Sequence, residues 1–194
     1  GDPGAFNDKT ILDTDPLTLI EGCIIAGYAT GSSNGIDVSR FEKTADRLQA
    51  ARGIRRELNF PIDAPVVGFV GRLTRDKGIV ELAEAFRTVQ QSHPDARLLL
   101  IGEFESGDPV PQDTIDWLRS NPAVCVAGFS KDPSDFYSVM DVLAFPSYRE
   151  GFPNVPLEAA AASIPVVGFT ATGTVDAVVD GQTGTLVPLG AVAA

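Results

Sequence analysis

Short apolar runs alternate with longer amphipathic stretches from about residue 65 to the end of the chain. The runs are continuous and rich in valine, isoleucine and leucine, as expected for strands that are covered on both faces. They occupy residues 66–70, 97–101, 124–127, 142–145, 165–169 and 185–187. Strands that alternate with helices are typical of a parallel, doubly wound sheet. The pattern therefore predicts an α/β fold class, with a Rossmann-like sheet in the order 3-2-1-4-5-6.

The stretches between the runs carry the spacing of helices. Between the first two runs, apolar residues recur every three or four positions, which predicts an amphipathic helix. These residues are Ile79, Leu82, Ala83, Phe86 and Val89. Asp132 followed by Pro133 combines an N-cap with a residue suited to a first helical turn. Helices are accordingly expected over residues 112–120, 133–140, 155–163 and 174–180.

The first third of the chain gives weaker signals. Residues 1–30 read as a loose tail. Residues 31–63 begin with a small, polar, turn-forming segment that looks like a connection. Over 40–59 charged and apolar positions alternate, which predicts one or two surface helices. We therefore expect one domain over 64–194, preceded by a connection.

The composition is that of an ordinary globular domain, with 44% hydrophobic and 21% charged residues. The net charge of −11 argues against nucleic acid as a partner, because an acidic surface repels phosphate backbones. The chain has no run of about eighteen apolar residues and no basic-then-apolar N-terminus, so we expect a cytoplasmic protein. Cys23 and Cys125 lack the spacing of metal ligands and are expected to be reduced thiols.

Right-handed crossovers place the loops that follow the strands on one edge of the sheet, where such folds bind ligands. The first of these loops, 71–78, joins a strand to a helix. Its glycines permit close backbone approach, and the helix that it opens offers free amides to an anion. Arg72 and Lys77 add charges suited to a diphosphate. The alternative is an ordinary turn with solvated cations, since the loop has neither a Walker A nor a Gly-x-Gly-x-x-Gly sequence.

The second loop, 147–158, also follows a strand and opens a helix. Glu150 lies in the loop and Glu158 about one turn into the helix, so two carboxylates can face one pocket. Carboxylates accept hydrogen bonds from paired hydroxyls such as those of sugars and ribose. Gly151 suits a turn, and the amides near 152–155 would point at an anion. In the alternative, Glu158 interacts with the helix dipole and Glu150 is a surface residue.

The third loop, 170–174, is small and rich in hydroxyls. It would either line a pocket or cap the following helix through Thr172 or Thr174, and we favour the cap. Three further carboxylates, those of Asp108, Asp113 and Asp116, look like a solvated face.

Catalytic sets built on histidine or metal find little support. His93 is the single histidine, precedes a proline and is expected to have a structural role at a helix end. No Ser/His/Asp or Cys/His arrangement can therefore be assembled. Asp13-Thr14-Asp15 resembles a metal-binding Asp-x-Asp sequence, but it lies in the irregular tail, so no metal site is predicted.

Four separated motifs lie at these loops. They are Gly71-Arg72-Leu73 with Lys77-Gly78, Pro146-Ser147 with Glu150-Gly-Phe-Pro-Asn-Val-Pro-Leu-Glu-Ala, Pro165-Val-Val, and Gly181-x-x-Gly-x-Leu-Val. In order and spacing the motifs resemble those of group 1 (family 4) glycosyltransferases, and the resemblance runs from about residue 33 to 188. The Glu-Gly-Phe-Pro-Asn-Val sequence is similar to that of bacterial capsular or exopolysaccharide sugar transferases. The family has the GT-B architecture of two facing Rossmann-like domains, so this chain would supply one half.

The resemblance implies a role for each loop. Arg72 and Lys77 would hold the donor diphosphate, Glu150 would bind the transferred sugar, and these three would form the catalytic set. Glu158 would bind the ribose. The donor-contacting residues implied are Gly71, Arg72, Lys77, Gly128, Phe129, Glu150, Gly151, Phe152, Asn154, Val155 and Glu158, with Gly128 and Phe129 beside the base. No cofactor or metal is implied, because the cations would stabilise the departing diphosphate.

By the same resemblance, the chain is the donor-binding domain of a retaining, hexosyl- or N-acetylhexosaminyl-type glycosyltransferase. It would move a sugar from a nucleotide-diphosphate sugar, expected to be a UDP-sugar, to a polysaccharide or lipid-linked acceptor. That acceptor would bind an N-terminal domain, and residues 1–30 would be either a tail or a remnant of that domain. Residues 31–63 would then be the interdomain connection and 64–194 the nucleotide-sugar-binding domain, truncated at its C-terminus.

The missing acceptor domain has consequences for activity. The fragment alone is expected to be inactive, and the full-length enzyme would associate peripherally with the inner face of the membrane. Two alternatives stay open. One is a non-catalytic sugar-nucleotide-binding module, and the other is a different GT-B enzyme such as a sugar-nucleotide epimerase.

Overall fold

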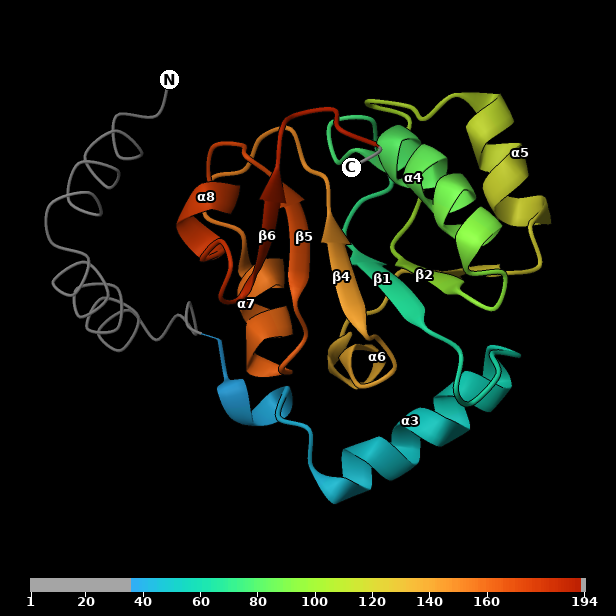
Figure 1. The fold of residues 1–194 in the computed structure, drawn as a ribbon, viewed down its shortest axis with the longest axis vertical. Coiled ribbons are helices and arrows are strands. Elements are labelled where there is room, and N and C mark those ends of the chain that lie inside the picture. Colours follow the sequence, from blue (N-terminus) through green and yellow to red (C-terminus); the bar gives the residue numbers. More distant parts are fainter. Residues whose placement is uncertain (1–35, 193–194) are drawn as a thin grey trace, which may run out of the picture. The chain divides into compact units, whose positions relative to one another are not determined.

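The computed structural model describes residues 36–192. Within them, six parallel strands form one sheet in the order β3-β2-β1-β4-β5-β6 (Figure 1). The strands are β1 (Val66–Val70), β2 (Arg97–Ile101), β3 (Val124–Gly128), β4 (Val142–Phe145), β5 (Val166–Phe169) and β6 (Gly184–Val187). The predicted fold class and strand order are confirmed, and each strand end lies within one residue of its predicted position.

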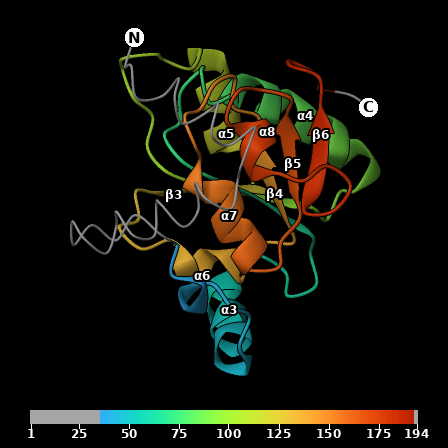
Figure 2. The ribbon, with the colours of Figure 1, turned by 90° about the vertical axis from the view of Figure 1, so that its left-hand side faces the viewer.

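Helices join the successive strands (Figures 1 and 2). They are α4 (Ile79–Ser92), α5 (Gln112–Ser120), α6 (Ser134–Tyr137), α7 (Asn154–Ala161) and α8 (Thr174–Ala177), while η1 (Val38–Arg40) and α3 (Ala45–Glu57) precede β1. The apolar stripe predicted for α4 is buried apart from Val89, which is half-buried, and it packs in one cluster with side chains of β1, β2 and α5. On the other half of the sheet, α7 contacts β4 and β5.

Three helices end before their predicted ranges do. After Tyr137, α6 gives way to tighter turns in which Val139 and Met140 donate to carbonyls three residues back. Helix α7 ends before Ser163, whose φ of 57° lies in the left-handed region. Helix α8 ends at Val178, which adopts the extended conformation that β-branched residues favour.

The surface helix predicted over 40–59 is α3. It begins at Thr44, whose hydroxyl accepts a hydrogen bond from the Arg47 amide at 3.3 Å. Arg55 anchors the helix to the segment that precedes β4, because its guanidinium donates to the Val139 carbonyl at 2.8 Å and to Asp141 at 3.1 Å. None of the helices in residues 36–192 has the length and apolarity to cross a membrane. The interpretations of residues 1–30, including Asp13-Thr14-Asp15 and Cys23, fall outside the described residues.

Candidate functional site

The loops after β1 and β4 meet where the strand order reverses. These two strands are hydrogen-bonded neighbours, but β1 continues through β2 to β3 and β4 continues through β5 to β6. The helices that follow them therefore diverge from this point. In open doubly wound sheets the resulting crevice, at the carboxyl ends of the strands, is the place where ligands bind.

The first loop is fixed by its glycine at the start of α4. Gly78 is the N-cap of α4 and has a φ of 73°, a conformation in which a residue with a side chain would be strained. A Cβ at this position would also lie 2.0 Å from the Pro146 carbonyl oxygen, on the loop after β4. Glycine is thus required here by the close packing of the first loop on the second.

Backbone hydrogen bonds join the three loops. The Tyr148 amide donates to the Asp76 carbonyl at 2.9 Å, and the Glu150 amide donates to the Thr172 carbonyl at 3.0 Å. The third loop approaches the second so closely that a Cβ on Gly173 would lie 2.4 Å from the Gly151 carbonyl oxygen. The backbone of Glu150 is therefore held between the first and third loops.

The cap predicted for the third loop is wrong. The N-cap of α8 is Gly173, and neither threonine side chain caps the helix. Thr174 is fully buried, and its hydroxyl has no hydrogen-bond partner among the described residues. The loop contributes through its backbone, since the carbonyl of Thr172 holds the Glu150 amide.

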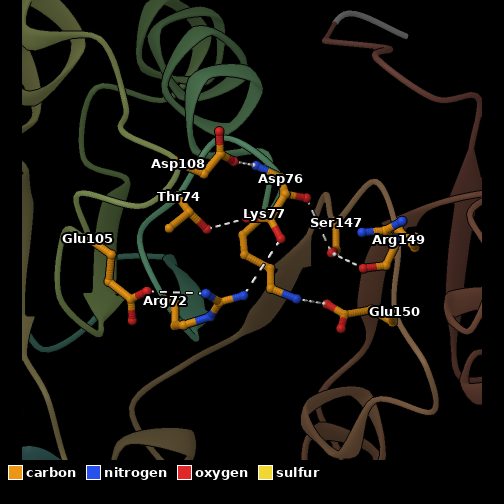
Figure 3. A network of polar contacts seen from close by, with 9 residues as sticks. All are labelled: Arg72, Thr74, Asp76, Lys77, Glu105, Asp108, Ser147, Arg149 and Glu150. Carbon is orange, nitrogen blue, oxygen red and sulfur yellow. Dashed lines mark hydrogen bonds and ion pairs between the residues drawn. The ribbon is translucent and has the colours of Figure 1, made fainter. Parts of the chain in front are cut away.

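Lys77 and Glu150 form an ion pair at the centre of this edge (Figure 3). The Lys77 ammonium lies 2.7 Å from Oε1 of Glu150, and only 15% and 16% of the two side chains are exposed. The pair joins two residues that the sequence assigned to one site, from loops 73 positions apart. A ligand with an anionic group next to hydroxyls could pair its anion with Lys77 and its hydroxyls with Glu150.

Arg72 is more exposed than Lys77 and is held by acidic neighbours. Its guanidinium donates to Glu105 at 3.1 Å and lies 3.7 Å from Asp76 (Figure 3). The hydrogen bond and charge of Glu105 raise the pKa of Arg72, so it stays protonated. Partial burial would raise the pKa of Asp76, but the Thr74 hydroxyl and the charges of Lys77 and Arg72 hold it below its usual range.

Glu105 and Asp108 also contribute to the site, although the sequence interpretation did not place them there. Glu105 follows β2 on the same sheet edge, and this position in the sequence could have indicated that it belongs to the site. Asp108 is not simply part of a solvated face, because its carboxylate accepts the Asp76 amide at 2.7 Å and steadies the first loop. Within the part of the chain that the structure describes, Asp113 and Asp116 contact only their neighbours on α5, Thr114 and Gln112.

Glu158 lies on α7 and has a partner of its own. Its Oε2 accepts a hydrogen bond of 2.6 Å from the hydroxyl of Tyr137, on α6. Burial, and then the nearby charge of Glu158, raise the pKa of Tyr137, so the phenol remains a donor. No interaction within residues 36–192 joins Glu158 directly to Lys77 or Glu150.

The start of α7 offers free backbone donors. No acidic residue lies in its first turn, and its N-cap, Pro153, provides no side-chain cap. Within the described part of the chain, no acceptor faces the amides of Phe152, Asn154 or Val155. Gly151 has no left-handed φ, and a Cβ there would meet nothing within 4 Å. Its expected turn role is therefore not required by the backbone, and the space in front of it is open.

The remaining predicted residues lie at the periphery of this edge or away from it. Gly128 has a φ of 80°, and its carbonyl accepts the Gly102 amide at 2.8 Å. Phe129 follows it with 73% of its surface exposed. His93 is the C-cap of α4, which confirms its predicted position at a helix end. Among the described residues, no group of three or more His, Cys, Asp or Glu side chains could hold a metal ion.

A doubly wound parallel sheet with paired charges at its switch point is the Rossmann-like architecture that forms each half of a GT-B glycosyltransferase. The chain belongs to the glycosyl transferases of group 1, whose family model matches residues 64–194. The resemblance seen in the motifs is thereby confirmed.

Known proteins with similar sequences and structures are also glycosyltransferases. The chain is 38% identical over 160 residues to the capsular polysaccharide biosynthesis glycosyltransferase CapM of Staphylococcus aureus, covering 82% of this chain and 41% of CapM. Anabaena HepE, solved with UDP and glucose, superimposes with a TM-score of 0.68 and 26% identity over 82% of this chain and 43% of HepE. The C-terminal domain of LpcC from Francisella tularensis superimposes with a TM-score of 0.65 and 25% identity, over 79% of this chain and 80% of that domain. The chain thus spans about two fifths of the curated relatives it matches.

Proposed function

We propose that this chain is the donor-binding domain of a retaining glycosyltransferase that uses a UDP-sugar. The observation that carries the proposal is the Lys77–Glu150 pair, 2.7 Å apart and largely buried at the switch point of the sheet. A cation beside a carboxylate matches a sugar diphosphate, which presents anionic oxygens next to hydroxyls. The HepE structures that contain UDP, or UDP and glucose, support the choice of nucleotide.

The diphosphate would replace Glu150 as the ion-pair partner of Lys77. In the structure described here the ammonium already has an anionic partner, so binding exchanges one anion for another. Arg72 and the amides of Phe152, Asn154 and Val155 would complete the anion site, aided by the positive end of the α7 dipole. Glu150, released from Lys77, would then accept hydrogen bonds from hydroxyls of the sugar.

These groups would act on the bond between sugar and diphosphate. Negative charge grows on the diphosphate as that bond breaks, and fixed cations and amides stabilise such charge without reorganising. No metal is needed for this step. The sugar would keep its anomeric configuration and pass to a saccharide or lipid-linked acceptor held by a further domain of a longer protein. The similarity to CapM supports an acceptor in polysaccharide synthesis.

The domain assignment belongs to the same proposal. Residues 64–194 would form the donor domain and 31–63 its connection to an acceptor domain. Calorimetric titration of the chain with uridine, UMP, UDP, GDP and UDP-glucose tests the binding function. We expect affinity to rise from uridine to UDP and UDP to bind more tightly than GDP. Equal affinity for uridine and UDP would contradict a diphosphate site.

Glu158→Gln is expected to weaken UDP and UDP-glucose alike, by about 1.5 kcal/mol, the low end for hydrogen bonds to charged groups. The substitution keeps the size of the side chain and one acceptor but removes the charge that two ribose hydroxyls would share. Calorimetry on both ligands measures the change. A loss confined to UDP-glucose would mean that Glu158 faces the sugar and not the ribose.

Gly151→Ala is expected to weaken UDP-glucose by about 1–2 kcal/mol, the cost of one extra methyl group in a close-packed contact. The new Cβ would meet no protein atom within 4 Å, and the backbone has no left-handed φ here. The thermal midpoint should therefore not fall, so any lost affinity would come from the ligand. Gly107→Ala is the matched control, since its Cβ is equally free. Unchanged affinity in Gly151→Ala would place the donor away from this loop.

A further inference from the structure

Tyr137 is fully buried, and its phenol hydroxyl is hydrogen-bonded to a carboxylate of the proposed donor site. Its side chain has no exposed surface, yet its hydroxyl donates to Oε2 of Glu158 over 2.6 Å. The two residues lie 21 positions apart, on α6 and α7. This hydrogen bond leaves Oε1 of Glu158 without a described partner.

The ring of Tyr137 is held by an aromatic neighbour and by the anchoring of helix α6. Phe41 packs edge-on against it, with ring centroids 5.3 Å apart and an interplanar angle of 84°. Helix α6 is itself fixed by Asp132, whose carboxylate accepts the Ser134 amide at 3.1 Å, and by Asp135, which pairs with Arg47 at 3.1 Å. The phenol hydroxyl therefore stays at one place, and it can hold the more mobile carboxylate there.

We propose that Tyr137 is a positioning residue that orients the Glu158 carboxylate for the two hydroxyls of a ribose. The proposal rests on the donor-binding function and adds a residue to its site. A glutamate side chain loses rotamer freedom when it is immobilised, and that entropy loss opposes binding. Tyr137 fixes it before the nucleotide arrives, so less of that cost falls on binding.

A purely structural role for the same bond predicts a different outcome. If the bond only satisfies a buried hydroxyl, its removal lowers stability and affects every ligand equally. If it positions Glu158, its removal affects only ligands with ribose hydroxyls, and only while Glu158 is present. The ratio of affinities for UDP and 2′,3′-dideoxy-UDP distinguishes the two roles.

The experiment is a double-mutant cycle of Tyr137→Phe and Glu158→Gln, with calorimetry of UDP and 2′,3′-dideoxy-UDP. Tyr137→Phe alone should weaken UDP about 3- to 10-fold, the range of one neutral hydrogen bond, and the dideoxy analogue less than about 2-fold. In the Glu158→Gln background the same change should weaken UDP clearly less, because the carboxylate that Tyr137 positions is gone. Additive losses in the cycle, or equal losses for both ligands, would overturn the positioning role.

Tyr148→Phe is the matched control. It removes a hydroxyl that also donates to a glutamate, Glu81, at 2.7 Å, and it should leave the affinity ratio unchanged. A similar fall of the ratio in Tyr148→Phe would also count against the proposal. If the unmodified chain does not bind UDP, the donor function fails; if it binds UDP but Glu158→Gln leaves that affinity intact, the ribose role of Glu158 fails, and the positioning role with it. If Glu158→Gln weakens UDP but Tyr137→Phe does not, only the positioning role fails.

Discussion

Lys77→Ala is expected to weaken UDP binding by about 1.5–3 kcal/mol, the range for hydrogen bonds to charged groups. Uridine should bind almost as well as to the unmodified chain, because it has no phosphate for the ammonium to meet. Lys77 lies at the switch point with only 15% of its side chain exposed, so water screens its charge less than that of a surface lysine. Calorimetry with both ligands gives the two values.

The substitution also leaves Glu150 without its cation, which should lower the free energy of unfolding. Lys77→Ala combined with Glu150→Gln removes the unpaired charge, so a loss of UDP affinity that persists in the double variant is not caused by misfolding. Arg75→Ala is the matched control, since it removes an equal charge from an exposed position of the same loop. If Arg75→Ala weakened UDP as much as Lys77→Ala, long-range attraction and not a local contact would explain the effect.

The placement of Lys77 could be predicted because the pattern that fixes it is local. Continuous runs of β-branched residues defined the strands, and the loops that follow parallel strands share one edge. The partner of Lys77 was harder to foresee. Glu150 lies 73 positions away, and the two meet because β1 and β4 are neighbours, which depends on the whole strand order.

Other parts of the site could not be predicted, for physical reasons. The bond between Tyr137 and Glu158 depends on how α6 and α7 pack, and neither sequence segment shows it alone. The threonines of the third loop have side chains suited to an N-cap. The cap position is Gly173 instead, where the second loop approaches so closely that it leaves no room for a Cβ. Here tertiary packing overrides local preference.

Glu150→Gln, introduced into a longer protein that carries an acceptor domain, is expected to lower kcat about 100-fold. Glu150 is assigned to the sugar, and a small error in the orientation of a reacting group costs about that factor. Steady-state turnover of the UDP-sugar measures the change. The control is Glu105→Gln, a carboxylate on the same sheet edge that contacts Arg72 and not Lys77. It should change kcat much less.

The same variant should bind UDP at least as tightly as the unmodified protein. In the ligand-free site Lys77 is engaged by Glu150 at 2.7 Å, and a diphosphate has to replace that carboxylate. Glutamine carries no charge and competes less for the ammonium, so UDP affinity should stay equal or rise. Weaker turnover together with undiminished UDP binding would separate a sugar-orienting carboxylate from a nucleotide-binding one. A loss of UDP affinity as large as that of Glu158→Gln would contradict this division of roles, because Glu150 would then contact the nucleotide itself.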